Sequence, residues 1–199
     1  MILNHLMGLY THPKEEWHAI EQNHEALKSS LSHVLLVALI PVICTFIAST
    51  EIGWNLGVGE PLFLTQQSAI LMSVGMYFGL IAGVLALAYL SFWMAKTFDA
   101  DPSFTQALEL ASYTATPLFM VGLAAFYPAI WFVMLVGLLG LTYSVYLLYT
   151  GVPIIMNIPE EKGFIYASSV VTAGLVLLVA LMASSVILWS MGLGPIHQS

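Results

Sequence analysis

Basic side chains are the scarcest feature of this sequence. Lys and Arg together number four in 199 residues, and all four are lysines. Charged residues make up only 8% of the chain, and its formal net charge is −7. A surface that binds phosphates needs clustered Lys and Arg, so this composition argues against a nucleic-acid partner.

Cysteine and the common catalytic motifs are also scarce or missing. Cys44 is the single cysteine, so it can form no intrachain disulfide, and we interpret it as a small packed thiol. The sequence contains no HExxH, GxSxG or GxxxxGK[ST] motif and no Cys pair with zinc spacing. It therefore predicts a protein that is not an enzyme and that has no metal or cofactor.

Long apolar runs dominate what is present. Hydrophobic residues make up 59% of the chain, and the mean hydropathy is +0.90. Crossing a bilayer takes about 20 apolar residues in a helix. Five runs come close to that length or exceed it, and they predict an all-α integral membrane protein: Leu31–Ser49, Ser68–Met94, Ala107–Tyr127, Ala129–Tyr149 and Phe164–Trp189.

The lysines indicate how these spans are oriented. Lys14 and Lys28 precede the first span, Lys96 follows the second, and Lys162 lies between the fourth and fifth. With five crossings these segments share one side, and positively charged loops stay in the cytoplasm. We therefore expect a multi-pass membrane protein with a cytoplasmic N-terminal segment (1–30), a five-span domain (31–190) and an external tail (191–199).

The N-terminal segment is predicted to contain an amphipathic helix over Pro13–Ser29. Its apolar stripe consists of Trp17, Ile20, His24 and Leu27. We expect Trp17, Ile20 and Leu27 to cover the cytoplasmic end of the bundle, with docking onto another protein as the alternative. The polar side also carries acidic and histidine side chains, for which solvation is a better interpretation than metal binding.

The second span carries a stripe of small residues, which allows close backbone approach in a membrane. Its members are Gly75, Gly79, Ala82, Gly83 and Ala86. We favour another helix of the same chain as the partner in this groove, and a second copy of the chain is the alternative. In the first span, Pro41 should produce a kink.

The third span is where chemistry could reside. A polar stripe enters the membrane on one helical face through Gln106, Glu109, Tyr113, Thr116 and Pro117. Counting from Pro102 places Glu109 about 10 Å along the helix, so we expect a carboxylate near the cytoplasmic interface that is hydrogen-bonded to Tyr113 or Gln106. A proton or cation relay is the alternative.

A family resemblance involves the same region. The segments PKEEWHAI, SFTQALEL, ASYTATPLFMVGL and YLLYTGVPIIMNIPEEKGFIYASSVV resemble the short bacterial branch of the Yip family of Ypt-interacting membrane proteins, from Pro13 to about Val176. The resemblance implies a five-helix domain in the bacterial inner membrane with a cytosolic N-terminus. Eukaryotic relatives contact Rab-type GTPases through longer N-terminal regions, so we do not extend that partnership to this chain.

Two functions follow as hypotheses. The first is a non-enzymatic organiser or adaptor that contacts the lipid bilayer and binds partner proteins or lipids, or forms a homo-oligomer through the small-residue groove or the N-terminal helix. The second is a small permease or channel that uses the polar stripe of the third span. Transporters ordinarily contain an internal repeat, and no self-similarity is evident here. Intramembrane hydrolysis is a distant third.

Overall fold

A computed structural model describes residues 2–23, 27–57 and 59–197. Five of its helical segments are long and apolar enough to cross a membrane, which confirms the predicted all-α membrane fold. These spans are Leu27–Ile52, Gln66–Phe98, Phe104–Phe126, Ile130–Ile155 and Glu161–Gly192. Each extends beyond the predicted apolar run at one end or both, because polar residues continue the helices at their ends.

The helices succeed one another with short connections, except for the longer segment over residues 53–65 between the first and second spans. In chain order they are α1 (Ile2–Thr11), α2 (Pro13–Asn23), α3 (Leu27–Val37), α4 (Leu39–Ile47), the π-helical turn η1 (Ala48–Ile52), α5 (Gln66–Ala95), the 3₁₀ turn η2 (Lys96–Phe98), α6 (Phe104–Met120), the 3₁₀ segment η3 (Val121–Phe126), α7 (Ile130–Ile155), α8 (Glu160–Leu188) and η4 (Trp189–Leu193). The third span is the most enclosed, because α6 packs against α3, α5 and α7. A tight turn at residues 127–129 separates η3 from α7.

The first span is divided by its proline. α3 ends at Val37 and α4 begins at Leu39, four and two residues before Pro41. A proline cannot donate to the carbonyl four residues earlier, so the helix is interrupted there, as the sequence predicted. The kink brings Pro41 against Gly122 of η3, where a Cβ built on the glycine would lie 2.3 Å from the Pro41 Cα.

The predicted helix over Pro13–Ser29 is wrong in its extent. α2 ends at Asn23, and Leu27 is the first residue of α3. His24 lies outside the described residues. Leu27 is 44% exposed, so it does not join Trp17 and Ile20, which are fully buried. The reason is that Leu27 belongs to a different helix, whose direction is set by the membrane span and not by α2.

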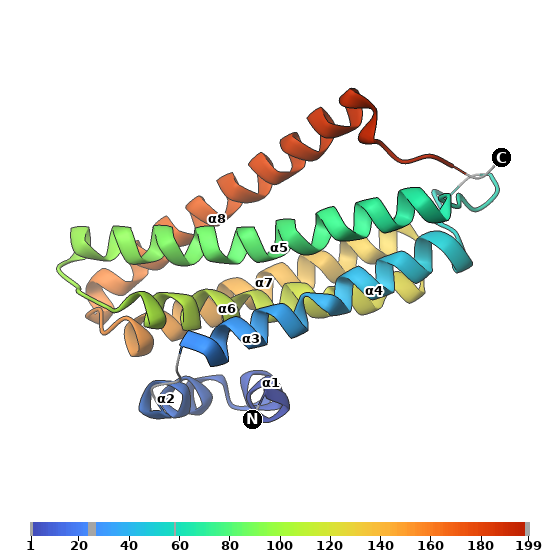
Figure 1. The fold of residues 1–199 in the computed structure, drawn as a ribbon. Helices are drawn as coiled ribbons and strands as arrows, with labels where there is room; N and C mark the ends of the chain where they lie inside the picture. The colour runs from blue at the N-terminus through green and yellow to red at the C-terminus, as the bar shows by residue number, and fades with distance from the viewer. Residues whose placement is uncertain (1, 24–26, 58, 198–199) are drawn as a thin grey trace.

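The structure also contains a helix that the sequence analysis did not predict. α1 and α2 lie crosswise to the spans, beside the start of α3 (Figure 1). Tyr143 of α7 holds α1 in place: its hydroxyl donates to the Leu9 carbonyl at 2.7 Å, and its ring stacks on Tyr10 at 5.3 Å between centroids. Burial of the Tyr10 side chain raises its pKa, and the nearby Tyr143 raises that pKa further.

Contacts between connecting segments group the connections at the two ends of the bundle. At one end, Lys162 forms an ion pair with Asp99, which joins the α5–α6 and α7–α8 connections. At the other end, Asn55 pairs with Ala129, and Leu64 pairs with His197 of the C-terminal tail. The tail therefore lies at the end of the bundle opposite to the one with Lys96 and Lys162.

The small-residue groove of α5 does not hold an internal helix along its length, contrary to our expectation. A Cβ built on Gly75 or Gly79 would meet nothing within 4 Å, and the one on Gly83 would meet only Leu181 of α8, at 3.4 Å. Ala82 is exposed and Ala86 is half-buried. The cause is the course of α8, which packs against α5 near Ser91 and then leaves its neighbours toward its C-terminal end (Figure 1).

Candidate functional site

A cluster of buried polar side chains lies between α3 and α6, close to α2. On α6 the cluster includes part of the predicted polar stripe, and on α3 it includes two residues that the sequence analysis missed. We call this set the polar cluster: Ser30, His33, Glu109, Ser112, Tyr113 and Thr116. A signal for the α3 members did exist, because Ser30, His33, Val34 and Val37 follow the spacing of one helical face.

His33 and Thr116 form the central hydrogen bond of the polar cluster. The His33 Nε2 lies 2.9 Å from the Thr116 hydroxyl oxygen, and that hydroxyl lies 3.0 Å from the Ser112 carbonyl. The threonine hydroxyl has one hydrogen, which it can donate either to the carbonyl or to the imidazole, so the donor in the His33–Thr116 bond depends on the tautomer of His33. In both cases the bond joins α3 to α6.

Tyr113 lies between a helix of the N-terminal segment and the first span. Its ring contacts His33 with 4.6 Å between centroids and meets the Trp17 indole edge-on at 6.3 Å. Trp17 fits there because α7 has a glycine opposite it: a Cβ on Gly151 would lie 2.7 Å from the indole ring. The N-terminal segment is thus inserted against the bundle through one large aromatic side chain.

Glu109 and Gln106 lie in different surroundings. Glu109 is 3% exposed, so protein encloses its carboxyl group, and its place near the cytoplasmic interface stays a prediction. The Gln106 side chain is directed elsewhere: its oxygen accepts from the Ser103 backbone N–H at 2.8 Å, and its nitrogen donates to the Ile155 carbonyl at 3.1 Å. Gln106 therefore caps α6 and links it to α7.

Pro117 is buried and distorts α6 only slightly. The helix continues to Met120 and then tightens into η3. Close packing occurs here, since a Cβ on Gly140 of α7 would lie 3.3 Å from the Pro117 carbonyl. Pro117 thus lies at a close contact between the third and fourth spans.

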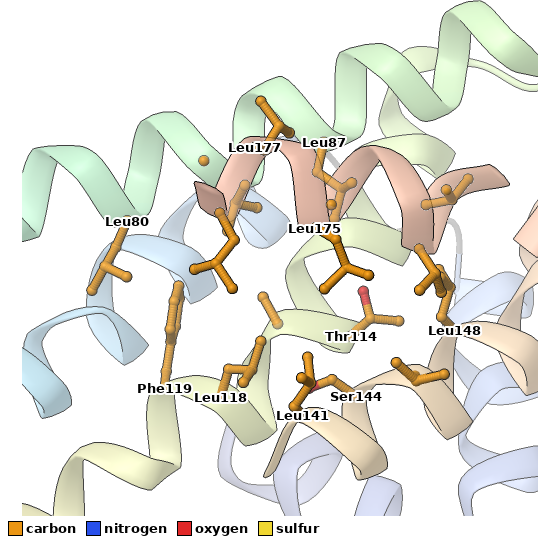
Figure 2. Close-up of a pocket in the computed structure, with 18 of the residues that line it drawn as sticks. Leu80, Leu87, Thr114, Leu118, Phe119, Leu141, Ser144, Leu148, Leu175 and Leu177 are labelled. Carbon is orange, nitrogen blue, oxygen red and sulfur yellow. The ribbon is translucent and has the colours of Figure 1, made fainter. Parts of the chain in front are cut away.

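A second feature, the apolar cavity, lies on another side of α6. It has a volume of about 200 Å³ and is partly open. Figure 2 shows Thr114 and Ser144 among the leucines that surround it. Its wall comes from four spans: Leu80, Gly83, Val84 and Leu87 of α5; Thr114, Ala115, Leu118 and Phe119 of α6; Leu141, Ser144, Val145 and Leu148 of α7; and seven residues of α8 between Val170 and Leu181.

Nothing in the sequence predicts this cavity. Its lining residues resemble any other apolar residues of a membrane span, and the space exists because α8 diverges from α5 and α7. The lining contains no charged side chain, and its two polar members are hydroxyls. Among the residues that the structure describes, no three His, Cys, Asp or Glu side chains are grouped to hold a metal ion.

The five spans and their enclosed third helix define a multi-pass integral membrane protein. Comparison with known proteins gives its family. The chain matches the Yip1 domain family over residues 7–181, and it belongs to that family. The inner membrane protein YohC of Escherichia coli K12 and that of E. coli O6:H1 are each 41% identical to it over 191 residues, which cover 96% of this chain and 98% of each relative.

These comparisons confirm the resemblance noted in the sequence and extend it at both ends. They also identify a multi-pass protein of the bacterial inner membrane. No solved structure matches the chain.

Proposed function

We propose that this protein is a non-enzymatic organiser of the inner membrane that holds lipid chains within its bundle and presents surfaces to partner proteins. The apolar cavity carries this proposal. An engineered apolar cavity of about 150 Å³ stays dry and binds benzene. The cavity here, at about 200 Å³, is larger and almost wholly apolar.

The position of the cavity favours lipid as its occupant. Its lining residues belong to membrane spans, and three residues of its α8 wall, Leu175, Leu178 and Leu181, are exposed. In a membrane, those exposed side chains contact the hydrocarbon of the bilayer. An empty space would leave its lining without contacts on one side, and a lipid chain supplies them.

A permease would need a polar path, and the arrangement of α6 does not favour one. Thr114 faces the apolar cavity, whereas Tyr113 and Thr116 face α2 and α3. The polar cluster is packed between helices with Trp17 against it, and the cavity contributes only two hydroxyl groups. The same enclosure favours a structural role for Glu109 over a catalytic one.

We further propose that the N-terminus is cytoplasmic and the C-terminus external. The ion pair between Lys162 and Asp99 groups two lysine-bearing connections at one end, and basic connections remain in the cytoplasm. For a protein partner or a second copy, the α5 groove is the better candidate, because Gly75 and Gly79 have open space beside them. Trp17 and Ile20 are already buried within the chain.

A photo-crosslinking experiment tests the lipid-holding role. The protein is placed in nanodiscs that contain a phospholipid with a diazirine on its acyl chain. Leu148 is 5% exposed, so it can be labelled efficiently only by a chain inside the cavity. We expect labelling at Leu148, loss of that labelling in Leu178→Trp, and no loss in Leu139→Trp, a control at an exposed position outside the cavity.

A flux measurement separates the organiser from a permease. In liposomes, we expect no proton or cation flux above protein-free vesicles, for the unchanged protein and for Glu109→Gln and Tyr113→Phe. Flux that either substitution abolishes, or absence of labelling at Leu148, would refute the proposed function.

A further inference from the structure

The apolar cavity ends against packed side chains at one end of the bundle. We call the end with Lys96 and Lys162 the lysine end, and the opposite end, with the C-terminal tail, the tail end. Tyr166 of α8 and Ser91 of α5 each lie about one helical turn beyond the cavity lining toward the lysine end. Both are buried, and the Tyr166 hydroxyl donates to the Ser91 carbonyl at 2.7 Å. This packing closes the cavity there.

The lining of the cavity becomes exposed in the other direction. Both α6 and α8 run from the lysine end to the tail end. On α8 the exposed fraction is 1% at Val170 and 48% at Leu178, and on α6 Thr114 is buried whereas Leu118 is exposed. α8 also leaves its neighbours in that direction (Figure 1). The cavity is therefore a slot that opens toward the tail end.

Access, and not depth, distinguishes the two leaflets as sources of a lipid chain. Thr114 lies about 15 Å from the start of α6, which is half the thickness of a hydrocarbon core of about 30 Å. The acyl chains of both leaflets reach the middle of the bilayer. A chain from the leaflet at the lysine end would have to displace the packed Tyr166 and Ser91, whereas a chain from the leaflet at the tail end follows the slot.

The charges at the tail end restrict the headgroup of such a lipid. The segments that lie there, 53–65, 127–129 and 193–197, contain no Lys or Arg. Glu51 and Glu60 are exposed at the same end, and the segment with Glu60 pairs with the tail. An anionic headgroup would find no lysine or arginine partner there and would be repelled by the carboxylates. A zwitterionic headgroup brings an ammonium group of its own beside its phosphate.

We propose that the apolar cavity takes an acyl chain of a phospholipid from the leaflet at the tail end, and that this lipid has a zwitterionic headgroup with an ammonium group. In the proposed orientation of the chain, that leaflet is the external one. The inference rests on the proposed lipid-holding role of the cavity.

The test uses the full-length protein in liposomes, with a tag at either terminus to capture vesicles by orientation. A C-terminal tag captures vesicles whose tail end faces outward, and an N-terminal tag captures the opposite population. Phosphatidylethanolamine with a diazirine near the end of one chain is exchanged into the outer leaflet of each population and irradiated at once. We expect labelling at the buried Thr114 when the tail end faces outward, and loss of that labelling when the lysine end does.

Two variants of α8 check that the open end of the slot is the route. Leu181 lines the cavity near this end, so Leu181→Trp should abolish the labelling of Thr114. Val179 is exposed on the same helix but does not line the cavity, so Val179→Trp should leave the labelling unchanged. Phosphatidylglycerol with the same chains should label about fivefold more weakly, which is the effect of one unit charge near another in water.

The outcomes separate this inference from the role on which it rests. Equal labelling in the two orientations, labelling only with the lysine end outward, or equal labelling by the two headgroups would overturn the inference and leave the lipid-holding role intact. Labelling that survives in Leu181→Trp would likewise overturn it. Absence of labelling in both orientations would refute the lipid-holding role itself.

Discussion

The insertion of Trp17 makes a quantitative prediction about how the N-terminal segment is held. Trp17 is fully buried, its ring contacts Tyr113, and its indole Nε1 has no hydrogen-bond partner in the described part of the chain. Two effects therefore oppose each other. The ring stabilises the docking of α2, and the buried N–H group weakens it.

Substitutions can separate these two effects. Replacing a buried Trp by Ala costs about 3–5 kcal/mol, and relief of an unpaired N–H group returns about 1–3 kcal/mol. For Trp17→Ala we expect the free energy of α2 opening to fall by about 2 kcal/mol, which is roughly a 30-fold change in the equilibrium. For Trp17→Phe the ring contact with Tyr113 remains and the N–H group is removed, so we expect a change within about 1 kcal/mol.

Hydrogen exchange of the α2 backbone amides measures this opening directly. Amides in the middle of α5 provide the internal control, since the spans should keep their protection in both variants. An equal loss of α2 protection in Trp17→Phe and Trp17→Ala would refute the reasoning, because it would mean that the indole N–H group stabilises the docked state. Unchanged protection in both variants would show that Trp17 does not anchor α2.

Two further predictions concern close packing and charge. Gly122→Ala should lower the thermal stability by about 2 kcal/mol, because the new Cβ would overlap Pro41. Gly75→Ala places its Cβ in open space and should be neutral or slightly stabilising. Thermal denaturation in detergent distinguishes the two variants, and equal losses of stability would contradict the packing argument. The hydrogen bond and charge of Lys162 hold the pKa of Asp99 below its usual value. The stabilisation of the folded state by this pair is therefore complete above the usual carboxyl pKa of about 3.9. It is lost as the pH falls through the lowered pKa of Asp99. Lys162→Gln should raise the Asp99 pKa toward that value in a ¹³C NMR titration, and an unchanged pKa would contradict the role of the ion pair.

The number and type of spans could be predicted from the sequence because the bilayer sets both the length and the apolarity of a crossing helix. The break beside Pro41 was also predictable, since it follows from local covalent geometry. These properties depend on short stretches of chain. The similarity to YohC, an inner membrane protein, agrees with the membrane assignment.

Properties that depend on how helices pack could not be predicted in the same way. The stripe with Gly75 and Gly79 shows where a helix could approach α5, but not that α8 diverges before reaching it. Likewise, the apolar pattern of Leu27 does not reveal which helix it belongs to. His33 could have been found from its spacing with Ser30 and Val37, but its contact with Thr116 depends on the packing of α3 against α6.

The attachment of α8 at both ends limits how it can move. Near its start, the Tyr166 hydroxyl donates to the Ser91 carbonyl at 2.7 Å, and beyond its end the Thr65 backbone N–H donates to the Ile196 carbonyl at 2.9 Å. Movement of α8 away from the bundle would therefore have to break a hydrogen bond at one end of the helix or at the other. On the proposed lipid-holding role, a lipid chain would enter the cavity beneath α8 from the side, along the plane of the membrane.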